Sequence, residues 1–329
     1  MPKKNTNQQK ITSIGGSALI EGIMMRGPKR TTVAIRTGEN DIYTEDLDVS
    51  AFLEKNKVRK IPIIRGIIGL IDSMRLSYKA LEISANKAME SAEIEEEPSK
   101  FEKWITDKFG DKLMKAVMII STVLGVAVAI GLFWFLPTYL YKLLCLAFPS
   151  IEGVVLLQSV FEGVLKIALF LLYIVIVSKL EDMKRVFMYH GAEHKTIFCY
   201  ENGEDLTVEN VKKQRRFHPR CGTSFLVVTL ILGILAGLFI PPAPFGIYAL
   251  RPIFKILILP IMIGLGYEVI KFCGRRDNTL TRILAAPGLW AQRITTKEPD
   301  DKMIECAIKA MQSVIPEDGS DIINNGCCK

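Results

Sequence analysis

The chain has 329 residues, 49% of them hydrophobic, and a formal net charge of +7 at pH 7. Long apolar stretches alternate with polar and basic ones, which excludes an ordinary soluble domain and an entirely membrane-embedded protein alike. The positive charge does not require a nucleic-acid partner, because Lys and Arg beside membrane helices produce the same balance. The seven cysteines are scattered, which argues against a disulfide framework.

Residues 1–60 predict a small cytoplasmic α+β unit. The chain begins with MPKKNTNQQK, which lacks the apolar core of a signal peptide, so we expect the N-terminus to stay in the cytoplasm. Residues 31–36 have the composition of a strand, residues 37–41 form a turn, and residues 42–44 resume an extended pattern. Together these segments predict a β-hairpin.

Residues 61–112 predict an amphipathic helix followed by an acidic linker. Apolar residues recur at helical spacing from Pro62 onward, with charged residues between them. They are Ile63, Ile64, Ile67, Ile68, Ile71, Met74 and Tyr78. This stripe suits a helix on the membrane surface or under the hairpin, and equally a helix in the core of its own domain. The acidic residues 93–97 predict a solvated linker.

Four apolar runs of about 20 residues predict four transmembrane helices, two within 113–178 and two within 224–271. The runs cover 113–136, closed by Pro137, and then 154–178, 224–240 and 253–270. Basic residues gather in 179–222 and 271–297 rather than in the short linkers between paired helices. The positive-inside rule therefore places both termini and the segment 179–223 in the cytoplasm.

Other features refine this arrangement. Glu162 and Lys166 are spaced i to i+4 in the second span, and we interpret them as a structural pair rather than a polar path. No helix breaker separates residue 154 from His190, so we expect the second span to continue into the cytoplasm as one helix. Within the cytoplasmic segment 272–329, residues 299–301 predict the start of an amphipathic C-terminal helix.

All three histidines of the chain lie in the polar segment 179–223. His190, Glu193 and His194 form an H-x-x-E-H arrangement, and residues three and four apart converge on one face of a helix. Two imidazoles beside a carboxylate are the nucleus of a divalent metal site, with zinc as the first expectation. His218 and Cys221 follow at ligand-like spacing, and both are candidates to complete the ligand shell.

The carboxylate and the nearby basic residues have candidate roles in catalysis and in substrate binding at this site. Glu193 is either a third ligand or the general base that deprotonates a metal-bound water. Lys195 and Arg220 are candidates to bind an anionic substrate group. In the competing interpretation, the polar side chains of this loop only hydrogen-bond one another, or a metal has a structural role instead of a catalytic one.

Several longer motifs resemble the YqhQ-like family of bacterial membrane proteins. They are residues 15–28 (GGSALIEGIMMRGP), 65–66 (RG), 189–196 (YHGAEHKT), 218–223 (HPRCGT), 287–289 (PGL) and 295–299 (TTKEP). The resemblance covers most of the chain and implies a location in the bacterial cytoplasmic (inner) membrane. The family is of unknown function and is described at most as predicted metal-dependent enzymes, which agrees with the histidine argument.

The resemblance adds three residues to the candidate site. Glu21, Arg26 and Arg65 belong to family motifs, and a carboxylate and two arginines near glycines suit a site in which the N-terminal unit covers the histidine segment. Arg26 and Arg65 would then contact the substrate. The alternative is an ion pair that stabilises the fold.

We therefore expect an α-helical polytopic membrane protein with about four transmembrane helices, a small cytoplasmic N-terminal α+β unit and a C-terminal amphipathic helix. The expected function is metal-dependent hydrolysis at the cytoplasmic face of the lipid bilayer. The alternative is a non-enzymatic scaffold that docks a cytoplasmic protein partner and holds a structural metal or a hydrogen-bonded loop.

Overall fold

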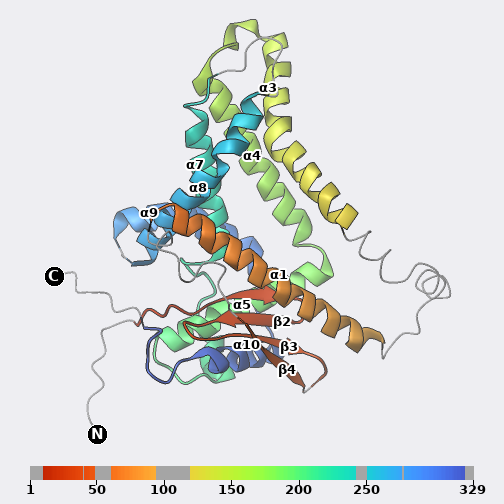
Figure 1. The fold of residues 1–329 in the computed structure, drawn as a ribbon, viewed down its shortest axis with the longest axis vertical. Helices are drawn as coiled ribbons and strands as arrows, with labels where there is room; N and C mark the ends of the chain where they lie inside the picture. Colours follow the sequence, from red (N-terminus) through yellow and green to blue (C-terminus); the bar gives the residue numbers. More distant parts are fainter. Residues whose placement is uncertain are drawn as a thin grey trace. The chain divides into compact units, whose positions relative to one another are not determined.

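The computed structural model describes residues 10–39, 41–48, 61–93, 119–241, 250–275 and 278–322 (Figure 1). They belong to two compact units. The motif unit comprises Met1–Ser91, Ile174–Val228 and Tyr267–Lys329, and the apolar unit comprises Ala92–Tyr173 and Thr229–Gly266. Residues 1–9 and the predicted acidic linker beyond Glu93 lie outside the described residues.

The motif unit is built around a small antiparallel sheet with strand order β1-β2-β3-β4. Its strands are β1 (Gly15–Leu19), β2 (Gly22–Arg26), β3 (Thr31–Arg36) and β4 (Ile42–Leu47). The predicted hairpin is confirmed, because β3 pairs with β4. The first hairpin was not predicted, because its first strand consists largely of glycine and other small residues, and glycine is depleted in strands. Its turn places Glu21 at φ 51°, in the left-handed region.

Helices cover both faces of this sheet (Figure 1). On one face, α1 (Ile64–Glu93) packs Leu76 and Ala80 against Val33 and other strand residues. On the other face, α5 (Glu181–Glu201) and α10 (Asp301–Val314) contribute to a second apolar core with β2 and β3. Asp300 is the N-cap of α10, and its side chain accepts a hydrogen bond of 2.8 Å from the Met303 amide.

The face of α1 that packs on the sheet differs from the predicted stripe. Leu76, Ala80 and Ser84 are buried and follow one another at i, i+4 spacing. Met74 and Tyr78, which belong to the predicted stripe, are 63% and 65% exposed. A small residue and a serine let the helix approach the strands closely, and the hydropathy pattern does not reveal that preference.

Within the described residues, three helices are long and apolar enough to cross a membrane: Ile119–Ala147, Val155–Val177 and Leu250–Cys273. The fourth predicted span corresponds to α7 (Gly222–Gly237), which has 16 residues and is shorter than the other three. The structure therefore supports a mostly helical protein with three candidate spans, and the fourth span stays a prediction.

The predicted end of the first span at Pro137 is wrong. A π-helical turn, η2 (Gly131–Phe135), precedes α3 (Leu136–Ala147), and the Leu136 amide bonds to the Gly131 carbonyl, five residues back. Proline lacks the amide hydrogen that a helix interior needs, and a local π adjustment lets the helix continue past it.

The predicted continuous helix from the second span to His190 is wrong as well. α4 (Val155–Val177) ends, and α5 begins after an extended residue, Leu180 (φ −69°, ψ 133°). Glu181 and Asp182 occupy the first turn of α5. Carboxylates at that position are stabilised by the positive end of the helix dipole, which favours a new helix start there.

Inside the apolar unit, Glu162 pairs with residues other than the predicted Lys166. Its carboxylate forms ion pairs with Lys255 and, at 3.3 Å, with Arg251. Lys166 instead lies over the Trp134 ring, 5.9 Å from its centroid. A long-range partner replaces the i, i+4 partner here, because two buried cations on α8 (Leu250–Arg275) need the carboxylate.

Candidate metal centre

The centre is assembled from α5 and the start of α7 within the motif unit. His190 and His194 lie one turn apart on α5, with ring centroids 4.4 Å apart. Cys221, immediately before α7, supplies a thiol. One ligand atom from each of the three residues lies within 4.8 Å of the others, and these are the metal-ligand types of a zinc site.

The hydrogen bonds of the two imidazoles fix their tautomers. His190 Nδ1 lies 2.8 Å from the Thr295 carbonyl, and His194 Nδ1 lies 2.5 Å from the Arg216 carbonyl. A carbonyl oxygen only accepts, so each Nδ1 carries the proton and each neutral ring keeps an unprotonated Nε2. Burial lowers the pKa of His194 to about 4, so this ring is neutral at pH 7.

Both imidazoles are thus prepared as ligands. His190 Nε2 lies 3.1 Å from Cys221 Sγ, and the sulfur has at most one proton to share between two ring nitrogens. A carbonyl that holds Nδ1–H while Nε2 faces outward is the usual second-shell arrangement of a metal-bound histidine. The donor set therefore fits a divalent transition metal.

Glu193 lies next to this group but is not one of the three donors. Its side chain is buried, and burial raises its pKa to about 7. The Gly16 amide donates a hydrogen bond to the carboxylate, whereas Oε2 has no hydrogen-bond partner among the described residues. A buried oxygen without a partner is rare and marks a place where another group binds.

Two glycines allow neighbouring backbone segments to pack closely against α5 at the metal centre. A Cβ at Gly16 would lie 2.9 Å from Glu193 Cδ and 2.8 Å from the Met24 carbonyl oxygen. A Cβ at Gly191 would overlap the Lys297 carbonyl oxygen. The backbone of β1 and the chain after α9 (Thr279–Thr295) therefore approach α5 at positions where only glycine fits.

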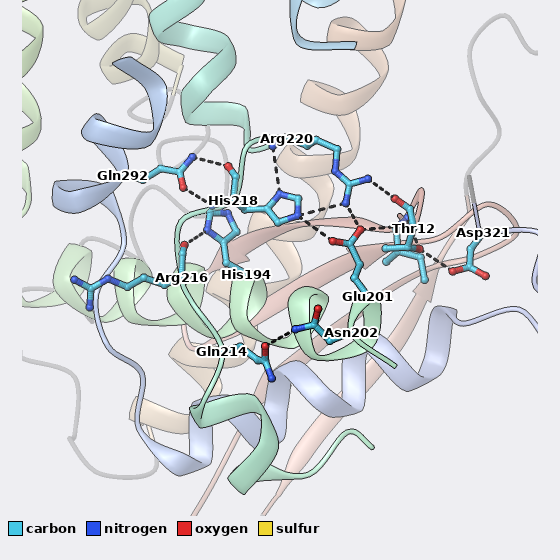
Figure 2. A network of polar contacts seen from close by, with 11 residues as sticks. Thr12, His194, Glu201, Asn202, Gln214, Arg216, His218, Arg220, Gln292 and Asp321 are labelled. Atoms are coloured by element: carbon cyan, nitrogen blue, oxygen red, sulfur yellow. Dashed lines mark hydrogen bonds and ion pairs between the residues drawn. The ribbon is translucent and has the colours of Figure 1, made fainter. Parts of the chain in front are cut away.

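The segment that carries Cys221 is held by Gln292 of α9 (Figure 2). Gln292 accepts from the His218 amide at 2.7 Å, donates to the His218 carbonyl at 2.8 Å and donates to Ser224 Oγ at 3.0 Å. These bonds fix the backbone on both sides of Cys221.

His218 lies beside His194, with ring centroids 5.5 Å apart, but outside the three-donor group (Figure 2). Its Nδ1 accepts from the Arg220 amide at 3.3 Å, and its Nε2 lies 3.8 Å from the Glu201 carboxylate. The sequence left His218 and Cys221 as alternatives, and the structure brings Cys221 to the two imidazoles.

Glu201 organises a second polar network that the sequence did not indicate (Figure 2). It accepts from the Thr12 amide at 2.9 Å and pairs with Arg220, and Thr12 in turn donates to Asp321 at 2.7 Å. Glu201 lies seven residues after His194, on the same helix face, which is the one signal that could have identified it. Thr12 and Asp321 give no local signal, because they meet only in the folded chain.

The remaining predicted residues divide between structural contacts and one pocket. Lys195 is buried, pairs with Glu298 and donates to the Lys212 carbonyl at 2.9 Å. Glu21 pairs with Arg185 and accepts from the Tyr189 hydroxyl at 3.2 Å. Arg26, Arg65 and Arg220 line a single pocket that also reaches Cys221.

Comparisons with known proteins agree with the motif analysis. The sequence profile of a family described as Protein of unknown function (DUF1385) matches residues 61–317. The chain is also 34% identical over 306 residues to "Uncharacterized protein YqhQ" of Bacillus subtilis (strain 168), and the match covers 92% of each chain. No solved structure matches the chain significantly.

Proposed function

This chain belongs to the YqhQ-like family, described as Protein of unknown function (DUF1385), and from its site we propose a membrane-anchored, metal-dependent hydrolase. His190, His194 and Cys221 would hold a divalent metal, zinc by the chemistry of the donors. The observation that carries the proposal is the convergence of one ligand atom from each of two imidazoles and one thiol within 4.8 Å.

Three donors converge among the described residues, and this number favours catalysis over a structural role. Structural zinc sites are closed by four protein ligands, whereas catalytic sites use three and leave a position for water. A zinc ion bound in this way lowers the pKa of its water to near neutrality. Glu193 is the proton acceptor in this proposal, because its Oε2 is buried beside the donors and has no partner among the described residues.

The proposed membrane topology adds a fourth span to the three candidate spans. We infer that α7 makes the fourth crossing, although its 16 residues give a length of about 24 Å. The positive-inside rule then places both termini and the metal centre on the cytoplasmic side of the inner membrane. The amphipathic α10 is part of the cytoplasmic face, with its apolar side in the core of the motif unit.

The direct test is metal content, measured by mass spectrometry on protein purified in detergent without chelators. We expect about one equivalent of zinc in the wild type and none in the His190→Ala/His194→Ala variant. His218→Ala is the matched control, because it removes a neighbouring imidazole outside the donor group, and we expect it to retain the metal. A wild type that stays metal-free after zinc loading would refute the proposal.

A second variant tests whether Glu193 is a metal ligand or the general base. With Glu193→Gln, we expect the metal to be retained and hydrolysis of any identified substrate to be lost, since the amide cannot accept the proton. Loss of the metal in this variant would make Glu193 a ligand and would remove its role as base.

One observation favours the scaffold alternative: the exposed apolar stripe on α1, which includes Ile71, Met74 and Tyr78. A cytoplasmic protein partner could dock there. In that case, capture of a partner would survive Glu193→Gln and fail with Ile71→Glu/Met74→Glu, whereas hydrolysis would show the opposite response.

A further inference from the structure

A basic pocket of about 830 Å³ adjoins the metal centre within the motif unit. Four of its lining side chains are cationic: Arg26, Arg65, Arg220 and Lys271. No carboxylate lines it among the described residues. The wall therefore presents positive charge to whatever enters.

The cations of the wall differ in their partners. Arg65 pairs with Glu268, and Arg220 pairs with Glu201. Lys271 lies 5.8 Å from the centroid of the Tyr267 ring. Arg26, at the end of β2, has no ion pair among the described residues. Arg26 therefore adds positive charge to this wall that an anionic group would balance.

The pocket also carries the features of a phosphate site beside the metal donors. Gly222 lines it and is the first residue of α7, so the positive end of that helix dipole lies at the wall. Cys221 lines it too. An anion held by the arginines would therefore lie next to the residues that we propose as metal ligands.

Part of the remaining lining is apolar, and two of the three helices that supply it are strongly apolar. Leu70 of α1, Phe225 of α7 and Ile270 of α8 form this part of the wall. α8 contains the candidate span Leu250–Cys273, and α7 is also strongly apolar. A charged wall and an apolar wall in one pocket suit an amphiphile whose head group is anionic and whose tail is hydrocarbon.

We propose that this pocket binds the phosphate monoester head group of a membrane lipid and places it beside the metal donors. The proposal rests on the proposed function, for which it names the substrate class. Arg26 is the main specificity-determining residue, since Arg65 and Arg220 also stabilise the fold through their ion pairs.

The test uses full-length protein in detergent and three probes: dihexanoyl phosphatidic acid, dihexanoyl phosphatidylcholine and inorganic phosphate. We expect saturable binding of phosphatidic acid, measured by calorimetry, and much weaker binding of the zwitterionic lipid. Arg26→Gln should weaken phosphatidic acid binding by about tenfold or more, the value of a charge-assisted contact. Arg30→Gln, an exposed arginine of the same hairpin with no place in the pocket lining, should leave it unchanged.

A second variant, which blocks the pocket sterically, is needed in case the replacement of Arg26 disturbs the fold. Gly69 lines the pocket on α1, and a Cβ there would meet only Tyr267, at 4.0 Å. The Cβ of Gly69→Leu therefore has room, and a bulky side chain at this lining position should also abolish binding. Competition by millimolar inorganic phosphate would identify the head group alone as the ligand, and lack of competition would identify the whole lipid. Equal binding of the two lipids, or wild-type binding by Arg26→Gln and Gly69→Leu, would overturn the proposal.

A parallel measurement of metal content distinguishes failure of the lipid-site proposal from failure of the hydrolase proposal. The His190→Ala/His194→Ala variant should lose zinc and still bind phosphatidic acid. If the wild type binds phosphatidic acid but takes up no metal, the lipid-site proposal stands and the hydrolase proposal is refuted. If it takes up zinc but does not bind the lipid selectively, the hydrolase proposal stands and the lipid-site proposal is refuted.

Discussion

Replacement of Gly16 by alanine tests whether β1 forms a wall of the metal centre. The new Cβ would lie 2.8 Å from the Met24 carbonyl oxygen and 2.9 Å from both Cγ and Cδ of Glu193. Each distance is shorter than a normal van der Waals contact, and one of the contacted atoms belongs to the backbone of the neighbouring strand. The strand or the Glu193 side chain must therefore move.

The magnitude follows from two opposing contributions. Overpacking of this kind costs about 1–3 kcal/mol. Alanine also loses less conformational entropy on folding than glycine, which returns about 0.4–1 kcal/mol. We expect a net destabilisation of the order of 1–2 kcal/mol, seen as a decrease of a few degrees in Tm, together with weaker zinc retention because Glu193 is displaced.

Gly15→Ala is the matched control, one residue away on the same strand. A Cβ at Gly15 would have no heavy atom within 4 Å, so only the favourable entropy contribution remains and Tm should stay constant or rise slightly. The measurement is thermal unfolding of both variants in detergent, with zinc content determined in parallel. Equal Tm values for the two variants would refute the argument that β1 closes on Glu193.

Three other outcomes are expected. Gly191→Ala should lower Tm more than Gly16→Ala, because its Cβ would overlap the Lys297 carbonyl oxygen, and an unchanged Tm would contradict this contact. Glu162→Gln should destabilise the apolar unit by about 3–5 kcal/mol in a denaturant titration, since Arg251 and Lys255 would lose their carboxylate. The replacement Lys166→Gln is its control and should cost much less. A chelator should lower the Tm of the wild type but not that of His190→Ala/His194→Ala, because only a protein that binds the metal is stabilised by it.

Local patterns in the sequence predicted local structure well. The hairpin of β3 and β4 followed from strand composition and a turn. The apolar runs identified the three helices in the described part of the chain that could span a membrane. The H-x-x-E-H spacing placed His190 and His194 on one helix face, and their rings are indeed neighbours. In each case the interaction is between residues close in the chain, so spacing alone carries the information.

The predictions that failed depended on partners far away in the chain. Lys166 was assigned to Glu162 because it lies one turn away, but Lys255 and Arg251 are the partners in the fold. The role of Gly16 was invisible, because it depends on a side chain at position 193. The prediction at Pro137 failed for a local reason instead: a π turn accommodates the proline, and it leaves no mark in composition.

The choice between His218 and Cys221 shows how the fold decides what spacing cannot. Both residues lie at comparable distances from His194 in the sequence, and each is a good zinc ligand. In the fold, the ring nitrogens of His218 face Arg220 and Glu201, whereas Cys221 faces His190. His218 is therefore committed to the network that anchors Arg220 at the basic pocket, and Cys221 is left for the metal. Arg220 of the proposed lipid site and Cys221 of the proposed metal centre are neighbours in the chain, and Cys221 lines the pocket as well, so a displacement of the backbone at these two residues should weaken metal and anion binding together.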